Sequence, residues 1–281
     1  MGILKQLDEP DFKATKSDKI LIEYIKENIE DVSYKSISQI SNESGIGEAT
    51  ITRFSKKMGY NGLQDFKVTL AQEISSMNNR KIINKNIEND ESVMESVRKI
   101  LNLNIRTLEN TYDVVNGKDI EKATDIMINA RKIYFIGIGY SGITAEDSNY
   151  KFMRIGFNCM SIKTSHEMIM LASLMGKNDV IIAISHSGET NEIIKAVGIA
   201  ISNGARVISI TEYGSSRLKD MSDVNLGYIS GESVLETGSI SSKMAQFFII
   251  DLIYTQVVKE KAAEVVESKI KTTNAIKLYN E

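Results

Sequence analysis

Apolar residues in the first quarter of the chain recur every three or four positions, the spacing that places side chains on one face of a helix. Four such groups begin at Ile20, Ile37, Ile51 and Leu63. No strand-like run interrupts them between Ser17 and Met77. The pattern therefore predicts that residues 1–77 form an all-α domain of several short helices.

Two longer amphipathic segments follow, and each is predicted to be a helix with one apolar face. They run from Ser92 to Tyr112 and from Gly117 to Arg131. The residues before them become rich in Asn and Lys, which is typical of a hinge or a solvated connection. We therefore expect a linker over residues 78–90 and a second domain over residues 91–281.

The pattern changes again after Arg131, where short apolar runs alternate with segments of helical length. The runs cover residues 133–136, 157–162, 180–184, 207–210 and, more weakly, 224–228. Continuous apolar strands separated by helices predict a parallel sheet that is buried on both faces. A last helix is expected from about Ser239 to Lys259. The second domain is therefore predicted to be α/β.

Composition narrows the class of protein without identifying a function. Hydrophobic residues make up 42% and charged residues 25% of the chain, the values of an ordinary globular protein. No stretch reaches the roughly 18 uninterrupted apolar residues of a membrane span, so we expect a cytoplasmic protein with no membrane partner. The single cysteine, Cys159, excludes an intrachain disulfide and a multi-cysteine metal site, and two histidines add little ligand capacity. We expect no metal and no cofactor.

Residues Ile37 to Phe54 have the pattern of a helix-turn-helix. Gly45 stands where the turn between the helices needs a left-handed backbone, and the second helix is expected to begin near Gly47. Residues on the outer face of such a helix contact base edges near its start and phosphates near its end. We expect base contacts from Thr50, Thr52 and Arg53, and phosphate contacts from Lys56 and Lys57.

The charge of the chain leaves two interpretations of this segment. The net charge is −3, although phosphate neutralisation by Lys and Arg supplies most non-specific affinity for DNA. Between residues 50 and 67, however, only Asp65 opposes the basic residues Arg53, Lys56, Lys57 and Lys67. This local basic patch favours DNA binding, whereas a small helical bundle with a solvated basic face would have the same composition.

One longer stretch distinguishes these two interpretations. Residues 53–67, with the sequence RFSKKMGYNGLQDFK, closely resemble the N-terminal domain of RpiR-type transcription regulators. The resemblance implies a helix-turn-helix domain over residues 1–77 that binds double-stranded operator DNA.

A glycine-rich loop directly follows the first apolar run of the second domain. Residues 137–142, GIGYSG, satisfy the letter of the dinucleotide-binding motif G-x-G-x-x-G. A dinucleotide site would also need an acidic residue at the end of the next strand, about 20 positions on, to bind the ribose. Residues 161–164 offer none, so NAD binding is disfavoured.

A second loop, residues 185–190 with the sequence SHSGET, follows the third run and precedes a helix predicted near Asn191. Its three hydroxyls, its glycine and the N–H groups of a helix N-terminus form an anion site that needs no Lys or Arg. If the two strands are neighbours, both loops open into one crevice. A phosphate would then lie between Ser141, Ser185, Ser187 and Thr190. The alternative for such residues, taken singly, is that they cap helices.

The second domain resembles the SIS family of sugar isomerase domains from about Arg131 to Val258. The resemblance implies a flavodoxin-like five-stranded parallel sheet with helices on both faces, and it implies that the two loops bind a phosphosugar. Residues 236–243, ETGSISSK, also resemble the stretch of glucosamine-6-phosphate synthases that carries a catalytic glutamate, and Glu236 falls at that glutamate. The residues expected to bind an effector are Gly139, Ser141, Ser185, His186, Ser187, Gly188, Thr190 and Glu236.

Together the two domains resemble an RpiR-type regulator of carbohydrate metabolism, in which a phosphorylated sugar controls binding to operator DNA. We expect a non-enzymatic homodimer or homotetramer in which Glu236 recognises the ligand. The alternative is a phosphosugar isomerase with an accessory N-terminal helical domain, for which Glu236 would be the base. A non-catalytic adaptor that binds another regulator is a third interpretation.

Overall fold

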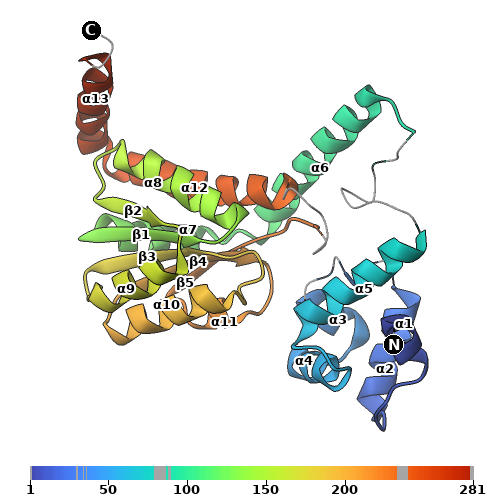
Figure 1. The fold of residues 1–281 in the computed structure, drawn as a ribbon. Helices are drawn as coiled ribbons and strands as arrows, with labels where there is room; N and C mark the ends of the chain where they lie inside the picture. The colour runs from blue at the N-terminus through green and yellow to red at the C-terminus, as the bar shows by residue number, and fades with distance from the viewer. Residues whose placement is uncertain are drawn as a thin grey trace. The chain divides into compact units, whose positions relative to one another are not determined.

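The computed structural model describes residues 2–29, 31–33, 35, 37–78, 87, 90–232 and 240–278 (Figure 1). The chain divides into two compact units, one of residues 1–106 with 231–241 and one of residues 107–230 with 242–281. The division falls within helix α6 (Val93–Val114), and again near the start of helix α12 (Ile240–Glu260). The predicted linker, residues 78–90, lies largely outside the described residues.

Short helices form the first unit around one apolar core. They are α1 (Ile3–Asp8), α2 (Lys16–Glu27), α3 (Ile37–Ser44), α4 (Glu48–Lys57) and α5 (Leu63–Asn78). The side chains at most 2% exposed include Leu21, Ile40, Ile51, Phe54, Phe66 and Leu70. Their spacing of three or four residues turns them toward one side of each helix, and their burial holds the helices together. Helix α1 is absent from the predicted elements, because six residues are too few to show a period.

The second unit is built on a five-stranded parallel sheet with the strand order β2-β1-β3-β4-β5. Its strands are β1 (Lys132–Gly137), β2 (Cys159–Ile162), β3 (Asp179–Ile184), β4 (Arg206–Glu212) and β5 (Val224–Tyr228). This is the flavodoxin-like order, and it confirms the predicted fold class. The ends of every strand fall within two residues of the corresponding apolar run.

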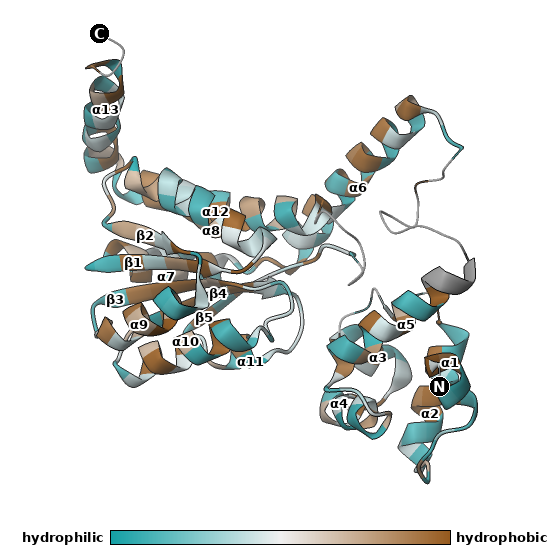
Figure 2. Cartoon of the chain, viewed as in Figure 1, coloured by the Kyte–Doolittle hydropathy of each residue, from teal (hydrophilic) through white to brown (hydrophobic). Residues whose placement is uncertain are grey.

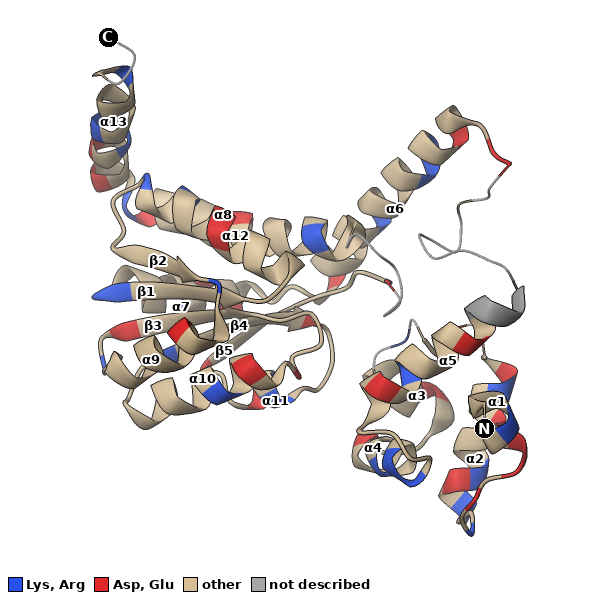
Figure 3. Cartoon of the chain, viewed as in Figure 1, with Lys and Arg blue, Asp and Glu red and all other residues tan. Residues whose placement is uncertain are grey.

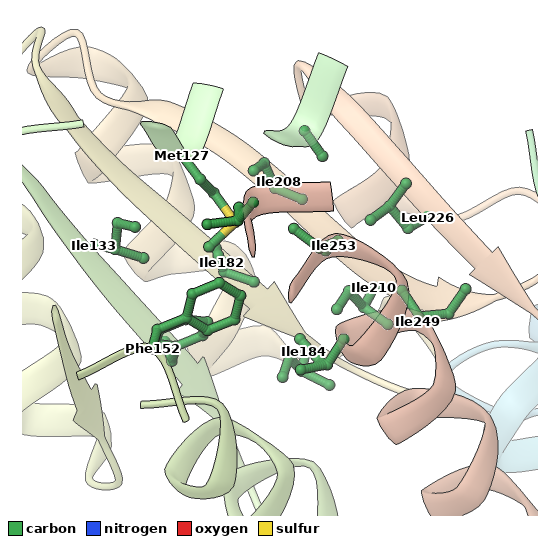
Figure 4. Close-up of a cluster of buried hydrophobic side chains, with 14 of the residues drawn as sticks. Met127, Ile133, Phe152, Ile182, Ile184, Ile208, Ile210, Leu226, Ile249 and Ile253 are labelled. Atoms are coloured by element: carbon green, nitrogen blue, oxygen red, sulfur yellow. The ribbon is translucent and has the colours of Figure 1, made fainter. Parts of the chain in front are cut away.

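Alternate residues of each strand face opposite sides of the sheet, so the sheet has a separate core on each face. Ile133 of β1 belongs to one core, and its neighbour Tyr134 belongs to the other. The first face is covered by α7 (Gly117–Ile128), α8 (Tyr140–Met153), α12 (Ile240–Glu260) and the start of α13 (Ala262–Leu278). Figure 4 shows this core, in which Phe152 of α8 and Ile253 of α12 lie among the isoleucines of the strands.

The opposite face of the sheet is covered by α9 (Ser165–Leu174), α10 (Asn191–Ser202) and α11 (Arg217–Asp220). The strands are hydrophobic along most of their length (Figure 2), as expected of a sheet buried on both faces. The last predicted helix, Ser239 to Lys259, corresponds to α12, whose described part begins at Ile240. Among the helices that the structure describes, none is both long enough and apolar enough to cross a membrane.

Candidate functional site

The two loops predicted to bind phosphate leave the sheet side by side. Strands β1 and β3 are hydrogen-bonded neighbours, and Gly137 at the end of β1 pairs in register with Ile184 at the end of β3. The chain enters α8 at Tyr140 after the first of these strands and α10 at Asn191 after the second. Both helix N-termini therefore lie at the carboxyl edge of the sheet, where the strand order reverses.

Glycine is needed in the first loop because α8 folds back closely onto β1. A Cβ atom on Gly137 would lie 2.4 Å from the carbonyl oxygen of Ser141, far inside van der Waals contact. Gly139, the N-cap residue of α8, has a φ of +62°, which favours glycine. This conformation places the buried Ser141 in the first turn of α8.

The hydroxyl groups of the second loop bond to one another and to the backbone of the loop. Ser185 Oγ and Thr190 Oγ1 lie 3.0 Å apart. The Ser187 hydroxyl accepts from the backbone N–H of Glu189 at 3.2 Å. These contacts gather three hydroxyls into one turn directly ahead of α10.

Helix α11 holds the second loop from its outer side. Gly188 has a φ of +64°, and its carbonyl oxygen accepts from the N–H of Leu218 at 3.1 Å. The next residue, Glu189, forms an ion pair of 2.6 Å with Arg217. The position of the loop is therefore fixed both by its strand and by a separate short helix.

The N-termini of α8 and α10 lack the side-chain caps that neighbouring helices possess. Asn116 caps α7 and Thr164 caps α9, because each side chain accepts a backbone N–H of the first turn. Gly139 and Thr190, the N-cap residues of α8 and α10, make no such bond within the described part of the chain. The alternative that the loop hydroxyls merely cap these helices is therefore not what the structure shows.

A row of buried, hydrogen-bonded polar side chains lies behind the two loops. Three of its members, Thr144, Tyr228 and Gln246, are absent from the predicted site. Gln246 of α12 donates from Nε2 to the hydroxyls of Ser141 at 3.3 Å and Tyr228 at 2.9 Å. Its Oε1 accepts from the hydroxyl of Thr144 at 2.8 Å. The Tyr228 hydroxyl lies 2.9 Å from Nδ1 of His186 in the second loop. The one sequence signal for these hydrogen-bonded side chains is a glutamine inside the apolar stretch MAQFFII, residues 244–250.

His186 stands between this buried row and solvent, with 37% of its side chain exposed. Its Nδ1 lies 3.6 Å from Oε2 of Glu212, whose carboxylate accepts from the backbone N–H and the hydroxyl of Ser230, both at 3.0 Å. In the portion of the chain that is described, no three His, Cys, Asp or Glu side chains gather as a metal ion requires. The hydroxyl groups of the two loops and the N–H groups at the starts of α8 and α10 are able to donate hydrogen bonds to an anion.

Glu236 and Cys159 were also singled out from the sequence. Glu236, the predicted sugar contact, lies outside the described residues. Cys159 is half-buried against the core of the sheet, and burial raises the pKa of its thiol to about 11. A thiol with that pKa is protonated at neutral pH and is unreactive.

Helices α3 and α4 form the predicted helix-turn-helix. Gly45 in the turn has a φ of +69°, as expected, and α4 begins at Glu48 directly after Gly47. The hydroxyl of Ser38 in α3 donates to the carboxylate of Glu48 at 2.7 Å, which joins the two helices. The side of α4 that carries Ile51 and Phe54 is buried in the core of the unit, and the charged residues Arg53 and Lys56 are exposed.

The predicted DNA contacts Thr50, Thr52, Arg53 and Lys56 lie on this helix. Arg53 and Lys56 are exposed, and Figure 3 shows Lys and Arg gathered on α4. Arg53 donates to the hydroxyl of Thr50 at 3.1 Å, so these two side chains are already paired on the surface. The half-buried Thr52 donates to the carbonyl oxygen of its own helix at Glu48.

Two lysines of the basic patch have partners inside the unit. Lys57 forms an ion pair of 2.7 Å with Asp18 of α2. Lys67 is buried and donates to the carbonyl oxygen of Lys35 at 2.8 Å. The inclusion of Lys67 in a surface patch was therefore wrong, because a contact with a residue 32 positions away decides its place.

Comparison with known proteins identifies both parts of the chain. A model of the SIS domain matches residues 126–256, and a model of the helix-turn-helix domain of the rpiR family matches residues 1–77. The NanR protein of Vibrio vulnificus, solved in complex with ManNAc-6P, has a similar fold with a TM-score of 0.82. It is 24% identical in sequence, and the similarity covers 98% of each chain.

Two curated relatives extend the comparison to whole sequences. An uncharacterised HTH-type transcriptional regulator of Clostridium perfringens is 54% identical over 276 residues, which are 98% of this chain and 99% of that protein. The HTH-type transcriptional regulator RpiR of Escherichia coli is 28% identical over 222 residues, 79% of this chain and 74% of that protein. The chain therefore belongs to the RpiR family of HTH-type transcriptional regulators, with an N-terminal helix-turn-helix domain and a SIS domain.

Proposed function

We propose that a phosphorylated sugar binds at the loops after β1 and β3 and controls the binding of this regulator to operator DNA. The observation that carries the proposal is the pair of helix N-termini, those of α8 and α10, that lie at one edge of the sheet and whose N-cap residues make no side-chain cap bond to any described residue. N–H groups at a helix N-terminus and the positive end of the helix dipole together favour an anion such as phosphate. The hydroxyls of Ser141, Ser185, Ser187 and Thr190 supply further donors.

The class of sugar is proposed from a structural neighbour. NanR of Vibrio vulnificus, whose fold matches 98% of this chain, was solved with ManNAc-6P. Phosphates of N-acetylated hexosamines are therefore the first ligands to test. Within that class, Glu236 is proposed to contact the sugar, and the phosphate is proposed to occupy the loops that contain Gly139, His186 and Gly188.

DNA recognition is proposed for the outer face of α4. Thr50, Thr52 and Arg53 are assigned to base edges, because the residues near the start of a recognition helix enter the major groove. Lys56 and Lys57 are assigned to phosphates. Lys57 keeps 41% of its side chain exposed despite its ion pair, so it remains accessible to a DNA backbone.

The regulator is proposed to act as a homodimer or a larger even-numbered assembly. Helix α6 presents apolar side chains at four-residue intervals, namely Val93, Val97, Leu101 and Ile105, which are 44–78% exposed. A helix face of this kind is typical of a surface that a partner covers. A two-fold dimer would present two copies of α4 to the half-sites of a palindromic operator.

A thermal-shift screen against phosphorylated sugars, followed by gel shifts on upstream DNA, tests this function. A ligand that binds only the folded chain stabilises it by about 2.7 kcal/mol at a concentration of about 100 Kd. We expect ManNAc-6P or a related hexosamine phosphate to raise the Tm and to change DNA mobility without being converted. If no phosphosugar raises the Tm, the proposal is wrong. Turnover without DNA binding would support the isomerase instead.

Two single substitutions separate the two proposed sites. Arg53→Ala is expected to relax sequence specificity, since a bidentate contact to a base is worth about 1–3 kcal/mol of discrimination. Ser187→Ala is expected to leave DNA binding intact and to weaken the response to the sugar. Ser202→Ala, at the far end of α10, is the control for Ser187→Ala. Wild-type behaviour of both test variants would refute the assigned sites.

A further inference from the structure

The polar side chains behind the two loops are buried too deeply to be solvated from outside. Tyr228 is 0% exposed, Gln246 is 2% exposed, and Thr144 is 0% exposed. Buried polar groups are retained where hydrogen bonds satisfy them, so the bonds of these residues define their orientation. The orientation in turn fixes which atoms of the two loops are donors.

Thr144 determines which way the amide of Gln246 points. Its hydroxyl lies 2.8 Å from Oε1 of Gln246 and 3.5 Å from the carbonyl oxygen of Tyr140. The shorter contact is the stronger, so the single proton of Thr144 is donated to Oε1. The amide nitrogen of Gln246 then faces the opposite way, and it donates its two protons to Ser141 and Tyr228.

Each of these two hydroxyls then accepts a bond from Gln246, and each keeps its own proton to donate. For Ser141, the bond from Gln246 is the one side-chain bond within the described residues, so its proton is available to a ligand at the start of α8. For Tyr228, the atom at 2.9 Å is Nδ1 of His186. A proton donated there leaves Nδ1 as an acceptor and places the ring proton of a neutral His186 on Nε2.

Among the described residues, Glu212 is a charged group close enough to this bond to compete for His186. Its Oε2 is 3.6 Å from Nδ1, beyond the length of a hydrogen bond. Its carboxylate oxygens instead accept from the N–H and the hydroxyl of Ser230. The Tyr228 hydroxyl is therefore the closer partner of the ring.

We propose that Gln246 and Tyr228 are positioning residues that set where the protons of both loops lie. In this arrangement the Ser141 hydroxyl offers its proton to the ligand, and neutral His186 carries its ring proton on Nε2, so the site favours a group with acceptors only, such as a phosphate dianion. The inference rests on the proposed function, since it assumes a phosphorylated ligand at these loops. It adds that a residue of α12 and a residue of β5, neither of them in the loops, determine the selectivity for an anion.

We call the hydrogen bonds that run from Gln246 through Tyr228 to His186 the bridge. The protonation pattern of His186 tests it without any ligand. The chain has two histidines, so long-range ¹H–¹⁵N correlation spectra resolve both rings, and the exposed His166 serves as the internal reference. We expect the Nε2–H form of neutral His186 in the wild type. In Tyr228→Phe we expect the proton to redistribute between the two nitrogens. A wild-type ring protonated on Nδ1, or a pattern unchanged in Tyr228→Phe, would overturn the proposal.

Gln246→Glu tests the same bridge through binding. The substitution preserves shape but turns the amide donor into an acceptor, so Ser141 and Tyr228 must donate inward and are withdrawn from the ligand. Affinity for the best phosphosugar of the screen, and for inorganic phosphate as a second probe, is expected to fall at least about tenfold, the factor for about 1.4 kcal/mol. Gln256→Glu, in the same helix and half-buried, should retain the wild-type affinity.

Tyr228→Phe provides a second binding test in case a buried carboxylate at position 246 prevents folding. It removes one hydroxyl, and we expect a loss of about threefold or more in affinity, with Tyr254→Phe in α12 as the control. Wild-type affinity in the folded variants would refute the bridge. If no phosphosugar binds the wild type, the proposed function fails, whereas the spectra of His186 still decide whether the bridge exists.

Discussion

Gly188 is the residue at which the second loop depends most strongly on one amino acid. Its φ is +64°, and a Cβ atom there would lie 2.2 Å from Oγ of Ser216. In Gly188→Ala the left-handed backbone costs about 1–2 kcal/mol, and the crowding against Ser216 adds about 1–3 kcal/mol. We expect a lower midpoint in urea unfolding and a loss of the thermal shift with phosphosugar.

Gly45→Ala separates these two costs. Gly45, in the turn before α4, has a similar φ of +69°, but a Cβ atom there would have no neighbour within 4 Å. This variant should therefore lose only the backbone contribution. If Gly188→Ala lowers stability no more than Gly45→Ala does, the contact with Ser216 does not constrain the loop.

Residues of the site could be predicted from the sequence where they are contiguous. Ser185, Ser187 and Thr190 follow one strand within six positions, so a local pattern is sufficient to find them. Gln246 lies 105 positions from Ser141, and its role depends on α12 packing across the same face of the sheet as α8. No local rule connects two such residues, and a lone glutamine in an apolar helix has no interpretation until its neighbours are known.

At the scale of elements, α2 begins with a capping box that also holds α4. The carboxylate of Asp18 accepts from the N–H of Thr15 at 2.9 Å, and the Thr15 hydroxyl accepts from the N–H of Asp18 at 3.3 Å. The same carboxylate forms the ion pair with Lys57 of α4, the helix proposed to read DNA. Loss of this carboxylate should therefore weaken the start of one helix and the attachment of another.

The charge of Asp18 should make the stability of the first unit dependent on pH. Burial acts to raise its pKa, but the bonds from Lys57 and Thr15 outweigh burial, and the pKa lies below its ordinary value of 3.8. A carboxyl whose pKa is lowered by folding stabilises the folded state above its unfolded pKa, and this contribution is lost as the pH falls through the folded pKa.

Asp18→Asn tests this dependence. The variant should be less stable than wild type by about 0.2–1 kcal/mol near neutral pH, the range for an ion pair with an exposed partner, because the amide keeps the shape of the side chain but loses the ion pair with Lys57. The difference should shrink as the pH falls below about 4, because the wild-type carboxylate is then protonated. Urea unfolding followed by far-UV circular dichroism at several pH values measures it. A difference that stays constant or grows in acid would contradict the assignment.

The elements predicted from the sequence are those whose apolar pattern is long or uninterrupted. Strands β1 and β3 are buried along nearly their whole length, so their apolar runs mark them clearly. Helices α1 and α11 have six and four residues, which is too short for a helical period to emerge. Their positions are set by packing, since Leu7 and Leu218 are each at most 1% exposed.

At the scale of the whole molecule, α6 and α12 each belong to both units, and most of α6 lies before the division between Arg106 and Thr107. The C-terminal turns of α6 are attached to the chain just after β5. The hydroxyl of Thr111 donates to the carbonyl oxygen of Ile229 and accepts from its N–H, both at 3.2 Å. Ser230, the next residue, is bonded to Glu212, which faces His186 in the second loop.

These contacts form a continuous path from the proposed sugar site to the helix that leads into the first unit. A ligand that moves His186 would alter the end of β5, and α6 is bonded to that end. Allosteric coupling between two sites typically changes affinity by roughly 5- to 150-fold. Part of that factor should therefore depend on the hydroxyl of Thr111, although neither site contains this residue.

Thr111→Val keeps the shape of the side chain and removes both bonds to Ile229. We expect the affinity for phosphosugar and the affinity for operator DNA, each measured alone, to change by less than about threefold. The ratio of the DNA affinities with and without the sugar is expected to fall by at least about threefold. Gel shifts at fixed salt measure that ratio, and Thr124→Val, a buried threonine bonded within α7, is the control. A wild-type ratio in Thr111→Val would mean that other contacts couple the two sites. A low ratio in Thr124→Val as well would mean that the ratio depends on the stability of the unit and not on the bonds between Thr111 and Ile229.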